Sequence, residues 1–583
     1  MINLSARKYF LILVILTAFW SAFSAFRDTN WQYRTVTSDG RGYYAFLPAL
    51  LVFQDNEYEQ VGRAELAKFE HWGNQNYIYQ TESGRKYNKC FPGVALMQSP
   101  AFVMGLIVSS LAGQETTGYS DISLIFVILN GWIFGLLGLW LMFLNLRFFT
   151  KDLFALYTAH FAITFATFLF FYLTAAPSFS HVYSFMALNL FAFLVLRIRE
   201  KSYSGLFFWL GIVLGVLFII RPTNVLVVLF LFFLLGSKSA VYQFFSDLFS
   251  HKAKKFLLGS IGFFTLVSIL PVLWYWQSGK WILWSYDGEG FYFDNPQILK
   301  TLFSYHMGLF VHVPLLLVSL IFLLIFARKG KWFVWSWISY FAVLVYLISS
   351  WWSYDYGSAL SNRAFSEHLF IFAFPLAVGL EKIRSKKLVL SVMALLIVYT
   401  WMRTYQHITC IFPTQRFTKE TFWKSLGDLK NNGEIRYFWL QDVLPFANNY
   451  ERFTLPTSQS NFIFNSEKEF GEFVNFEFPD TVRGNRYVID IEFDKQLNGS
   501  ENWNDILLVA DGIHEFTDER NYITLPIFNY FREGLNYPDQ TRITMDLYYD
   551  QKPSTSMKLY FWNMSKKSFE IKNLKVTLVK AVR

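Results

Sequence analysis

Charged residues and cysteines are scarce in this chain. Lys, Arg, Asp and Glu together make up 16% of its 583 residues, while 54% are hydrophobic and 20% aromatic, which is far too apolar for a soluble protein of this length. The cysteines, Cys90 and Cys410, show no Cys-x-x-Cys spacing, so neither a zinc site nor a thioredoxin-type centre is indicated. A disulfide between them requires that both face an oxidising compartment. The chain also lacks a Walker loop and a dinucleotide fingerprint, and chemistry on soluble nucleotide sugars is therefore not supported.

Long apolar runs dominate the chain instead. About 20 helical residues cross a hydrocarbon core of ~30 Å, and runs near this length recur over residues 1–404. We therefore expect an α-helical polytopic membrane protein whose transmembrane module covers residues 1–404. Eleven transmembrane helices are predicted, at 9–26, 120–146, 154–173, 181–197, 206–220, 223–237, 256–275, 307–327, 332–350, 365–380 and 388–404.

The basic residues indicate how these helices are oriented. The formal net charge of +9 comes mostly from short Lys and Arg clusters between apolar runs, such as Arg147 with Lys151. Such clusters are typical of cytoplasmic loops, and nucleic-acid binding is not expected. The long apolar runs place the protein in the lipid bilayer, and the positive-inside rule then places its N-terminus in the cytoplasm. The first run could also be a cleaved signal peptide, but ten further runs favour a retained signal anchor.

The apolar stretch 93–112 is interpreted differently. It is long enough to cross a membrane, but Pro100 and Gly105 lie in its middle, and a crossing here would put the later basic clusters on the outer face. We expect it to lie at the outer interface. Residues 27–119 then form the first extracytoplasmic loop, in which 43–53 and 64–69 have the spacing of short helices that lie on a membrane surface.

The composition changes after residue 404, where no later segment can span a membrane. Residues 405–459 are expected to form a linker with one or two helices. Beyond about residue 460 apolar residues recur with period two, as in Tyr487, Ile489, Ile491 and Phe493, which predicts strands. We expect an extracytoplasmic β-sandwich over residues 460–583. It could bind an acceptor glycan, but sandwich packing explains the same alternation.

Asp39 is the most informative residue of the outer loop. It lies in the polar turn Ser38-Asp39-Gly40-Arg41-Gly42-Tyr43-Tyr44, soon after the first apolar run. Further along, Lys89-Cys90-Phe91-Pro92-Gly93 leads into an apolar helix with the pattern Leu-x-x-x-Pro, and the Pro-Gly break can place Lys89 close to Asp39. Later motifs complete an ordered set: Pro177-Ser178-Phe179-Ser180-His181, Arg221-Pro222-Thr223-Asn224, Ser304-Tyr305-His306-Met307-Gly308, and Trp351-Trp352 through Gly357 to Arg363.

This layout resembles the GT-C glycosyltransferases, especially the membrane enzymes related to aminoarabinose transferases, protein mannosyltransferases and rhizobial core-sugar transferases. The likeness covers residues 1–404. It implies transfer of a sugar from a polyprenyl-phosphate carrier to an envelope glycan, lipid or protein acceptor on the outer side of the cytoplasmic membrane, with inversion at the anomeric carbon. It also implies that Asp39 is the catalytic acid position. Gly40 departs from the Asp-Glu of many relatives, and Asn88-Lys89 from the Glu-Lys of some, so a second carboxylate must come from elsewhere or be absent.

The reaction itself indicates which side chains are needed. A glycosyl phosphate already contains a good leaving group, so the enzyme must deprotonate an acceptor hydroxyl, orient it, and neutralise charge on the phosphate. Asp39 could act as the base, with its pKa raised by a desolvated interface or lowered by Lys89. The alternative is that Asp39 caps a turn or the helix that begins near Tyr43.

Cations on the outer face are candidates for binding the donor phosphate. Topology disfavours Lys and Arg there, so those that occur can have an anionic partner, and Arg binds two oxygens at once. The alternative for each is a side chain that snorkels from a helix end. The candidates are Lys89, Arg221 and Arg363, together with His181 and His306, which lie at the outer ends of spans and could equally be structural.

Candidates for the sugar or the acceptor are weaker. Tyr43, Trp352 and Asp355 lie beside the motifs, and Asp287 and Glu289 lie in an acidic loop. The acids could bind hydroxyl groups or a divalent metal, but without a ligand-spacing pattern a solvated loop explains them, and no cofactor or metal is assigned. The aromatic residues fit an interfacial belt as well as a sugar platform.

Two other functions compete with this interpretation. An O-antigen-type polymerase or ligase would use a diphosphate-linked oligosaccharide, but a large late outer loop rich in Arg would be expected. A lipid-glycan flippase or transporter would need charged residues inside its spans and related halves.

Overall fold

The structure is a computed structural model that divides into two compact units, residues 1–408 and 409–583, which are described separately. In the first unit it describes residues 4–26, 31–69, 77–201, 203–286, 289–327, 333–356 and 360–408. In the second it describes residues 409, 419–429, 449–465, 467–477, 486–496, 506–514, 520–526, 540–546, 554–564 and 568–582.

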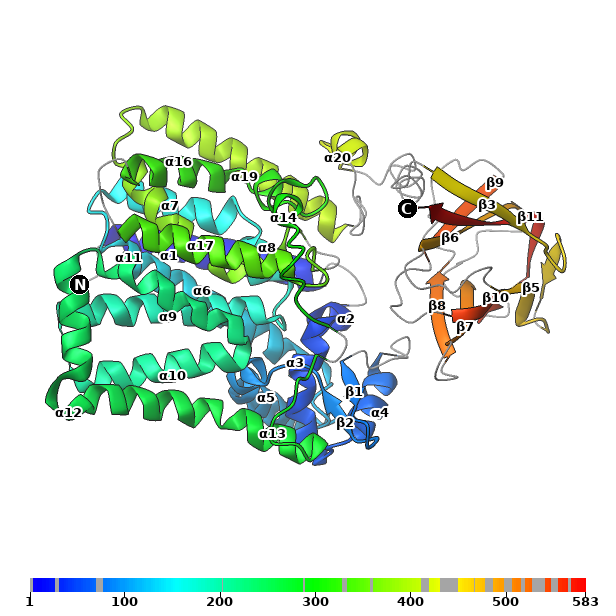
Figure 1. The fold of residues 1–583 in the computed structure, drawn as a ribbon, viewed down its shortest axis with the longest axis horizontal. Helices are drawn as coiled ribbons and strands as arrows, with labels where there is room; N and C mark the ends of the chain where they lie inside the picture. The colour runs from blue at the N-terminus through cyan, green and yellow to red at the C-terminus, as the bar shows by residue number, and fades with distance from the viewer. Residues whose placement is uncertain are drawn as a thin grey trace. The chain divides into compact units, whose positions relative to one another are not determined.

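The first unit is a bundle of apolar helices (Figure 1). Within the described residues, seven helices are long and apolar enough to cross a membrane, or eight if a pair bent by 64° counts as one span. The chain is therefore a multi-pass membrane protein. The seven are α1 (Leu4–Phe26), α5 (Gly93–Leu111), α6 (Asp121–Leu146), α9 (Ser180–Glu200), α17 (Phe333–Ser350), α19 (Lys386–Ile408), and the part of α12 (Lys238–Val267) from Ala253 on together with α13 (Ile269–Ser278); the bent pair is α7 (Leu153–Phe165) with α8 (Leu169–Ala175).

Every apolar run that was predicted to span contains helix in its described residues, but several of these helices are short or broken. Arg221-Pro222 ends α10 because proline has no N–H for the helical ladder, and a 3-10 helix follows. The count of eleven spans is therefore not confirmed. The shorter elements are α10 (Ser204–Ile220), η2 (Pro222–Phe230), α11 (Leu231–Leu235), α14 (Ile298–Phe303), α15 (Leu309–His312), α16 (Leu315–Ala327), η3 (Arg363–His368) and α18 (Phe370–Leu380).

Helix α5 has the length and composition of a span, and its placement at the outer interface stays a prediction. It packs along the first part of α6, where Gly105 approaches Ser123 and the hydroxyls of Ser109 and Ser120 lie 2.6 Å apart. Figure 1 shows α5 beside α3 at one end of the bundle.

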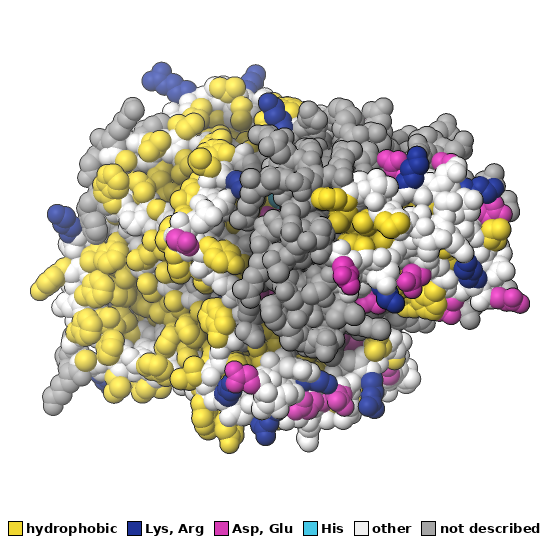
Figure 2. All heavy atoms as spheres, turned by 45° about the vertical axis from the view of Figure 1, so that its right-hand side comes forward, with side chains coloured by type: hydrophobic (Ala, Val, Ile, Leu, Met, Phe, Trp, Pro, Cys, Tyr) yellow, Lys and Arg dark blue, Asp and Glu magenta, His cyan; other side chains and the backbone are white. Residues whose placement is uncertain are grey.

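The surface of the helical unit is apolar, as a lipid-facing surface should be (Figure 2). Hydrophobic side chains gather over its helices, and several large ones are more than half exposed, including Phe264 at 63% and Leu395 at 71%. Inside, helices pack closely: a Cβ at Gly211 of α10 would lie 1.9 Å from the carbonyl oxygen of Gly259 in α12. Only glycine allows the two backbones to approach so far.

The segment between α1 and α5 folds against this bundle. It contains α2 (Trp31–Thr35), α3 (Asp39–Pro48), the π-helical η1 (Ala49–Phe53), α4 (Glu59–Lys68) and a hairpin of β1 (Ile78–Gln80) and β2 (Lys86–Asn88). Short helices were predicted at 43–53 and 64–69, and helices form close to both ranges. The prediction that they lie on a membrane surface is wrong for α3, because its residues from Gly40 to Pro48 are buried in protein. Arg41 of α3 donates to Glu65 of α4 at 2.7 Å, which joins the two helices.

The second unit contains a short helix and two antiparallel sheets. The sheets have the orders β5-β10-β7-β8 and β3-β11-β6-β9, with β4 paired to β11, and strands from both contribute to one hydrophobic core. The predicted period-two positions Ile489, Ile491 and Phe493 are buried in that core. The elements are α20 (Lys419–Ser425), β3 (Asn449–Leu455), β4 (Phe462–Phe464), β5 (Phe470–Glu477), β6 (Arg486–Gln496), β7 (Ile506–His514), β8 (Arg520–Pro526), β9 (Gln540–Asp546), β10 (Ser554–Asn563) and β11 (Phe569–Val582).

Candidate functional site

Asp39 is the first residue of α3, and its carboxylate faces the bundle instead of capping the helix. Ser38 before it has a positive φ of 49°, which turns the chain sharply into α3. Gly40 after it leaves no room for a side chain, since a Cβ there would lie 2.1 Å from Oγ of Ser178. Position 40 therefore has to be small because Ser178 fills the space.

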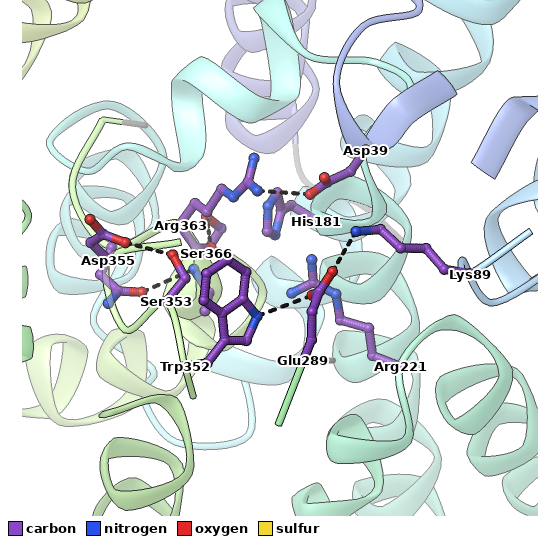
Figure 3. Close-up of polar contacts among 12 residues, drawn as sticks. Asp39, Lys89, His181, Arg221, Glu289, Trp352, Ser353, Asp355, Arg363 and Ser366 are labelled. Atoms are coloured by element: carbon purple, nitrogen blue, oxygen red, sulfur yellow. Dashed lines mark hydrogen bonds and ion pairs between the residues drawn. The ribbon is translucent and has the colours of Figure 1, made fainter. Parts of the chain in front are cut away.

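Arg363 of η3 is the direct partner of Asp39 (Figure 3). Its Nη2 donates to Oδ2 of Asp39 at 2.8 Å, and the guanidinium lies over the ring of Phe179. Burial alone would raise the pKa of Asp39, but the charges of Arg363, Arg221 and Lys89 outweigh it, so this pKa is lowered. Asp39 is therefore ionised at neutral pH, and the three predicted phosphate-binding cations all act on it.

Lys89 is held beside this pair by the hairpin and the turn that follows. Its backbone N–H donates to Tyr77 at 2.9 Å, and Gly93 packs so tightly against the end of α10 that a Cβ would lie 2.5 Å from the nitrogen of Ile220. The Pro-Gly break was predicted to place Lys89 close to Asp39, and the charge of Lys89 does act on that carboxylate.

Glu289 is the carboxylate that pairs with Lys89. The ammonium lies 2.6 Å from Oε1 of Glu289, Tyr79 donates to the same oxygen at 2.9 Å, and the indole of Trp352 donates to Oε2 at 3.1 Å. This ion pair raises the pKa of Lys89 although burial alone would lower it. Lys89 was predicted to bind the donor phosphate, and Glu289 and Trp352 to bind the sugar or the acceptor. Glu289 therefore joins the two predicted groups by direct contacts.

Arg221 and His181 share a carboxylate that the sequence argument did not select. Nη1 of Arg221 lies 3.2 Å from Oε1 of Glu367, and Nδ1 of His181 lies 2.6 Å from Oε2. Glu367 is 1% exposed. An ionisable residue inside the predicted span 365–380 was a usable signal for this carboxylate, because a charge at that depth needs a partner.

A cavity extends from this cluster between η2, η3 and α17. Its polar end is formed by Arg221 and Glu367, and its apolar wall by Leu344, Leu347 and Ile348 of α17. The lining therefore combines charged and apolar side chains.

Other predicted residues are placed less centrally. His306 and Asp355 contact each other at 3.2 Å, and Asp355 also accepts from Ser353 at 2.8 Å, on the opposite side of Trp352 from Lys89 in Figure 3. Tyr43 is buried in α3, where burial raises the pKa of its phenol. It therefore packs beneath the site and offers no open sugar platform.

Two predictions fall on residues outside the described part of the chain, namely Asp287 and Cys410. Cys90 is buried as a free thiol against Gly42. Among the described residues, no group of three or more His, Cys, Asp and Glu side chains could hold a metal ion.

Comparison with known proteins gives fold neighbours and no family. No family model and no curated protein matches the chain. Oligosaccharyltransferase AglB from Archaeoglobus fulgidus, in complex with an inhibitory peptide and a dolichol-phosphate, has a TM-score of 0.39 at 12% identity, over 75% of this chain and 60% of that one. An Archaeoglobus fulgidus oligosaccharyltransferase in the apo form has a TM-score of 0.37 at 12% identity, over the same shares of the two chains. Arabinosyltransferase EmbB from Mycobacterium smegmatis has a TM-score of 0.36 at 11% identity, over 100% of this chain and 65% of that one.

The neighbours are GT-C membrane glycosyltransferases, the superfamily that the sequence motifs resemble. The chain spans less than two thirds of the length of each. At these identities and TM-scores, the function has to be argued from the residues of the site itself.

Proposed function

We propose that this protein transfers a sugar from a polyprenyl-phosphate donor to an envelope glycan, lipid or protein at the outer face of the cytoplasmic membrane, with inversion. The observation that carries the proposal is the convergence of Lys89, Arg221 and Arg363 on Asp39. These cations come from three distant parts of the chain, and one carboxylate with two or three cations is the set that the reaction needs.

The cations provide a site for the donor phosphate. Arginine can hold two phosphate oxygens at once, and lysine adds a compact charge. The apolar wall of the cavity beside Arg221 suits the carrier chain. Charge that develops on the phosphate oxygen as the sugar leaves is then neutralised at a site of low dielectric, where the interaction is strong.

Asp39 receives the proton of the acceptor hydroxyl. The acceptor oxygen attacks the anomeric carbon from the face opposite the phosphate, the carbon–oxygen bond to the phosphate breaks, and polyprenyl phosphate leaves. A lowered pKa makes Asp39 a weak base while Arg363 contacts it. When the phosphate takes up the charge of Arg363, the carboxylate becomes more basic at the moment when the donor is in place.

The acceptor is proposed to lie near Glu289 and Trp352. A carboxylate beside an exposed indole can bind sugar hydroxyls and stack on a sugar ring, and Trp352 is 36% exposed. We propose further that the second unit is an extracytoplasmic β-sandwich that helps to bind the acceptor, and that the N-terminus is cytoplasmic.

Release of free polyprenyl phosphate tests the proposal. The purified protein is incubated with a panel of polyprenyl-phosphate sugars and an envelope acceptor fraction, and Asp39→Asn is compared with wild type. Loss of a general base costs about 10²- to 10⁴-fold in turnover. The matched control is Asp121→Asn, because Asp121 pairs with Lys68 on the outer end of α6, away from the cations of the site.

Wild-type release that Asp39→Asn abolishes and Asp121→Asn keeps supports the reaction and the base. Release only from diphosphate-linked oligosaccharides would indicate a polymerase or ligase instead. No release from any donor would favour a flippase or transporter.

A further inference from the structure

The charged side chains of the site balance one another. Each cation pairs with one carboxylate: Lys89 with Glu289 at 2.6 Å, Arg363 with Asp39 at 2.8 Å and Arg221 with Glu367 at 3.2 Å. A phosphodiester carries one negative charge, so its binding, which rests on the proposed function, would leave one negative charge in excess. Such a charge is costly in a buried site unless a positive charge arrives with it.

His181 can supply that positive charge. Its ring is fully buried, and Nδ1 lies 2.6 Å from Oε2 of Glu367. No residue in the described part of the chain forms a hydrogen bond with Nε2, and Nε of Arg363 is likewise buried without a described partner. Buried polar atoms are nearly always hydrogen-bonded, so two of them together indicate a place where a ligand binds.

A second buried histidine shows what a structural role looks like in this fold. Nδ1 of His160 lies 2.6 Å from the hydroxyl of Tyr9, and its Nε2 lies 2.8 Å from the carbonyl oxygen of Leu139. Both ring nitrogens of His160 are therefore satisfied within the bundle. His181 differs from His160 because one of its ring nitrogens contacts a carboxylate and the other has no hydrogen-bond partner among the described residues.

We propose that binding of the donor phosphodiester is coupled to uptake of one proton by His181, and that Glu367 is the positioning residue for this imidazolium. Glu367 fixes the ring through Nδ1, so that Nε2–H is the donor that remains for a phosphate oxygen. Figure 3 shows His181 between the Asp39–Arg363 pair and Arg221, which are the groups that the phosphate is proposed to meet.

Groups from several elements act on the charge of His181. Burial has the largest effect and disfavours the imidazolium, Glu367 favours it, and Arg221 and Arg363 disfavour it. Asp39 and His368 interact with it as well. The ring of Tyr172 in α8 packs against the imidazole of His181, with the two ring centroids 4.5 Å apart. When a phosphate neutralises the two arginines, the balance moves toward protonation of His181.

Calorimetry on the full-length protein in nanodiscs tests this coupling directly. The probe is farnesyl methyl phosphate, a phosphodiester that keeps a single charge through the neutral range and cannot itself take up the proton. Titration at neutral pH in buffers of different ionisation enthalpy gives the number of protons bound. We expect about one proton per bound probe, and an affinity that falls about tenfold for each pH unit above the transition.

Variants assign the proton to a residue. His181→Gln can still form hydrogen bonds but cannot become charged, so uptake and pH dependence should both disappear. Glu367→Gln keeps an acceptor for Nδ1 without the charge, and the transition should move to lower pH. The matched control is His160→Gln, which should leave the proton uptake unchanged.

The outcomes separate this inference from the proposed function. Probe binding without proton uptake in wild type, or uptake that survives in His181→Gln, overturns the coupling and leaves the donor class intact. If wild type does not bind the probe at any pH, the donor class fails and the coupling with it. If His181→Gln does not fold, the wild-type titration in the different buffers still decides whether a proton is bound.

Discussion

Two acid–arginine pairs lie at the start of α3, and their surroundings give them opposite properties. Glu65 is 1% exposed, bonded to Arg41 and to the hydroxyls of Tyr77 and Tyr119, and its pKa is raised because burial outweighs the charge of Arg41. The Asp39 side chain is 35% exposed, and its pKa is lowered because several cations outweigh burial. The structural pair is buried and bonded to neighbouring hydroxyls, whereas the Asp39–Arg363 pair has further cations nearby and is accessible to a ligand.

The largest effect on stability is expected when the buried Arg41–Glu65 pair is broken. Glu65→Gln removes the carboxylate charge that lies 2.7 Å from the buried Arg41 guanidinium, and loss of one partner of a buried pair costs about 3–5 kcal/mol. Thermal unfolding of the purified protein should show a lower Tm. Equal stability of this variant and wild type would mean that the Arg41–Glu65 pair does not hold α3 to α4.

Arg363→Gln should act on turnover and leave stability nearly unchanged. Loss of a charge that stabilises the transition state costs about 10²-fold or more in kcat/KM. The matched comparison is Arg363→Lys, which keeps the charge but not the two-oxygen geometry and should lose less. A fall in Tm without a fall in turnover would place Arg363 with the structural pairs.

The same variant should change the pH dependence. The lowered pKa of Asp39 keeps the carboxylate ionised at neutral pH, and its basic form is lost only as pH falls through that lowered value. The acidic limb of the kcat/KM profile should therefore lie below the usual pKa of an aspartate in wild type and move to higher pH in Arg363→Gln, because the cation with the largest effect on Asp39 has been removed. An unmoved acidic limb would show that Asp39 is not the titrating base.

A smaller effect is expected at Gly40, which lies between the two pairs. Gly40→Ala places a Cβ 2.1 Å from Oγ of Ser178, and such overpacking typically costs about 1–3 kcal/mol. The double variant Gly40→Ala with Ser178→Gly should recover part of the stability, which thermal unfolding would show. No recovery would mean that α3 fails for a reason other than the contact with Ser178.

The smallest effect belongs to the Lys68–Asp121 pair, which is partly exposed. Asp121→Asn should change stability by less than about 1 kcal/mol and leave turnover unchanged, because exposed ion pairs are screened by solvent. A marked loss of turnover would extend the site to this end of α6.

The sequence by itself determined the helical membrane class, the positions of the apolar helices and the strands near the C-terminus. These follow from local patterns, since apolar length and period-two alternation are properties of single segments. The motif spacing also identified Asp39, Lys89, Arg221, Arg363 and His181 as candidates for one site.

Only the tertiary structure decided which of these side chains meet and with which partners. Glu289 and Glu367 pair with Lys89 and Arg221 across large sequence separations, and no local pattern specifies such contacts. The burial of α3 and the need for glycine beside Ser178 likewise depend on neighbours far along the chain. A charge, a pKa and an open hydrogen-bond position are set by everything packed around a residue, and for that reason they appear only in the folded protein.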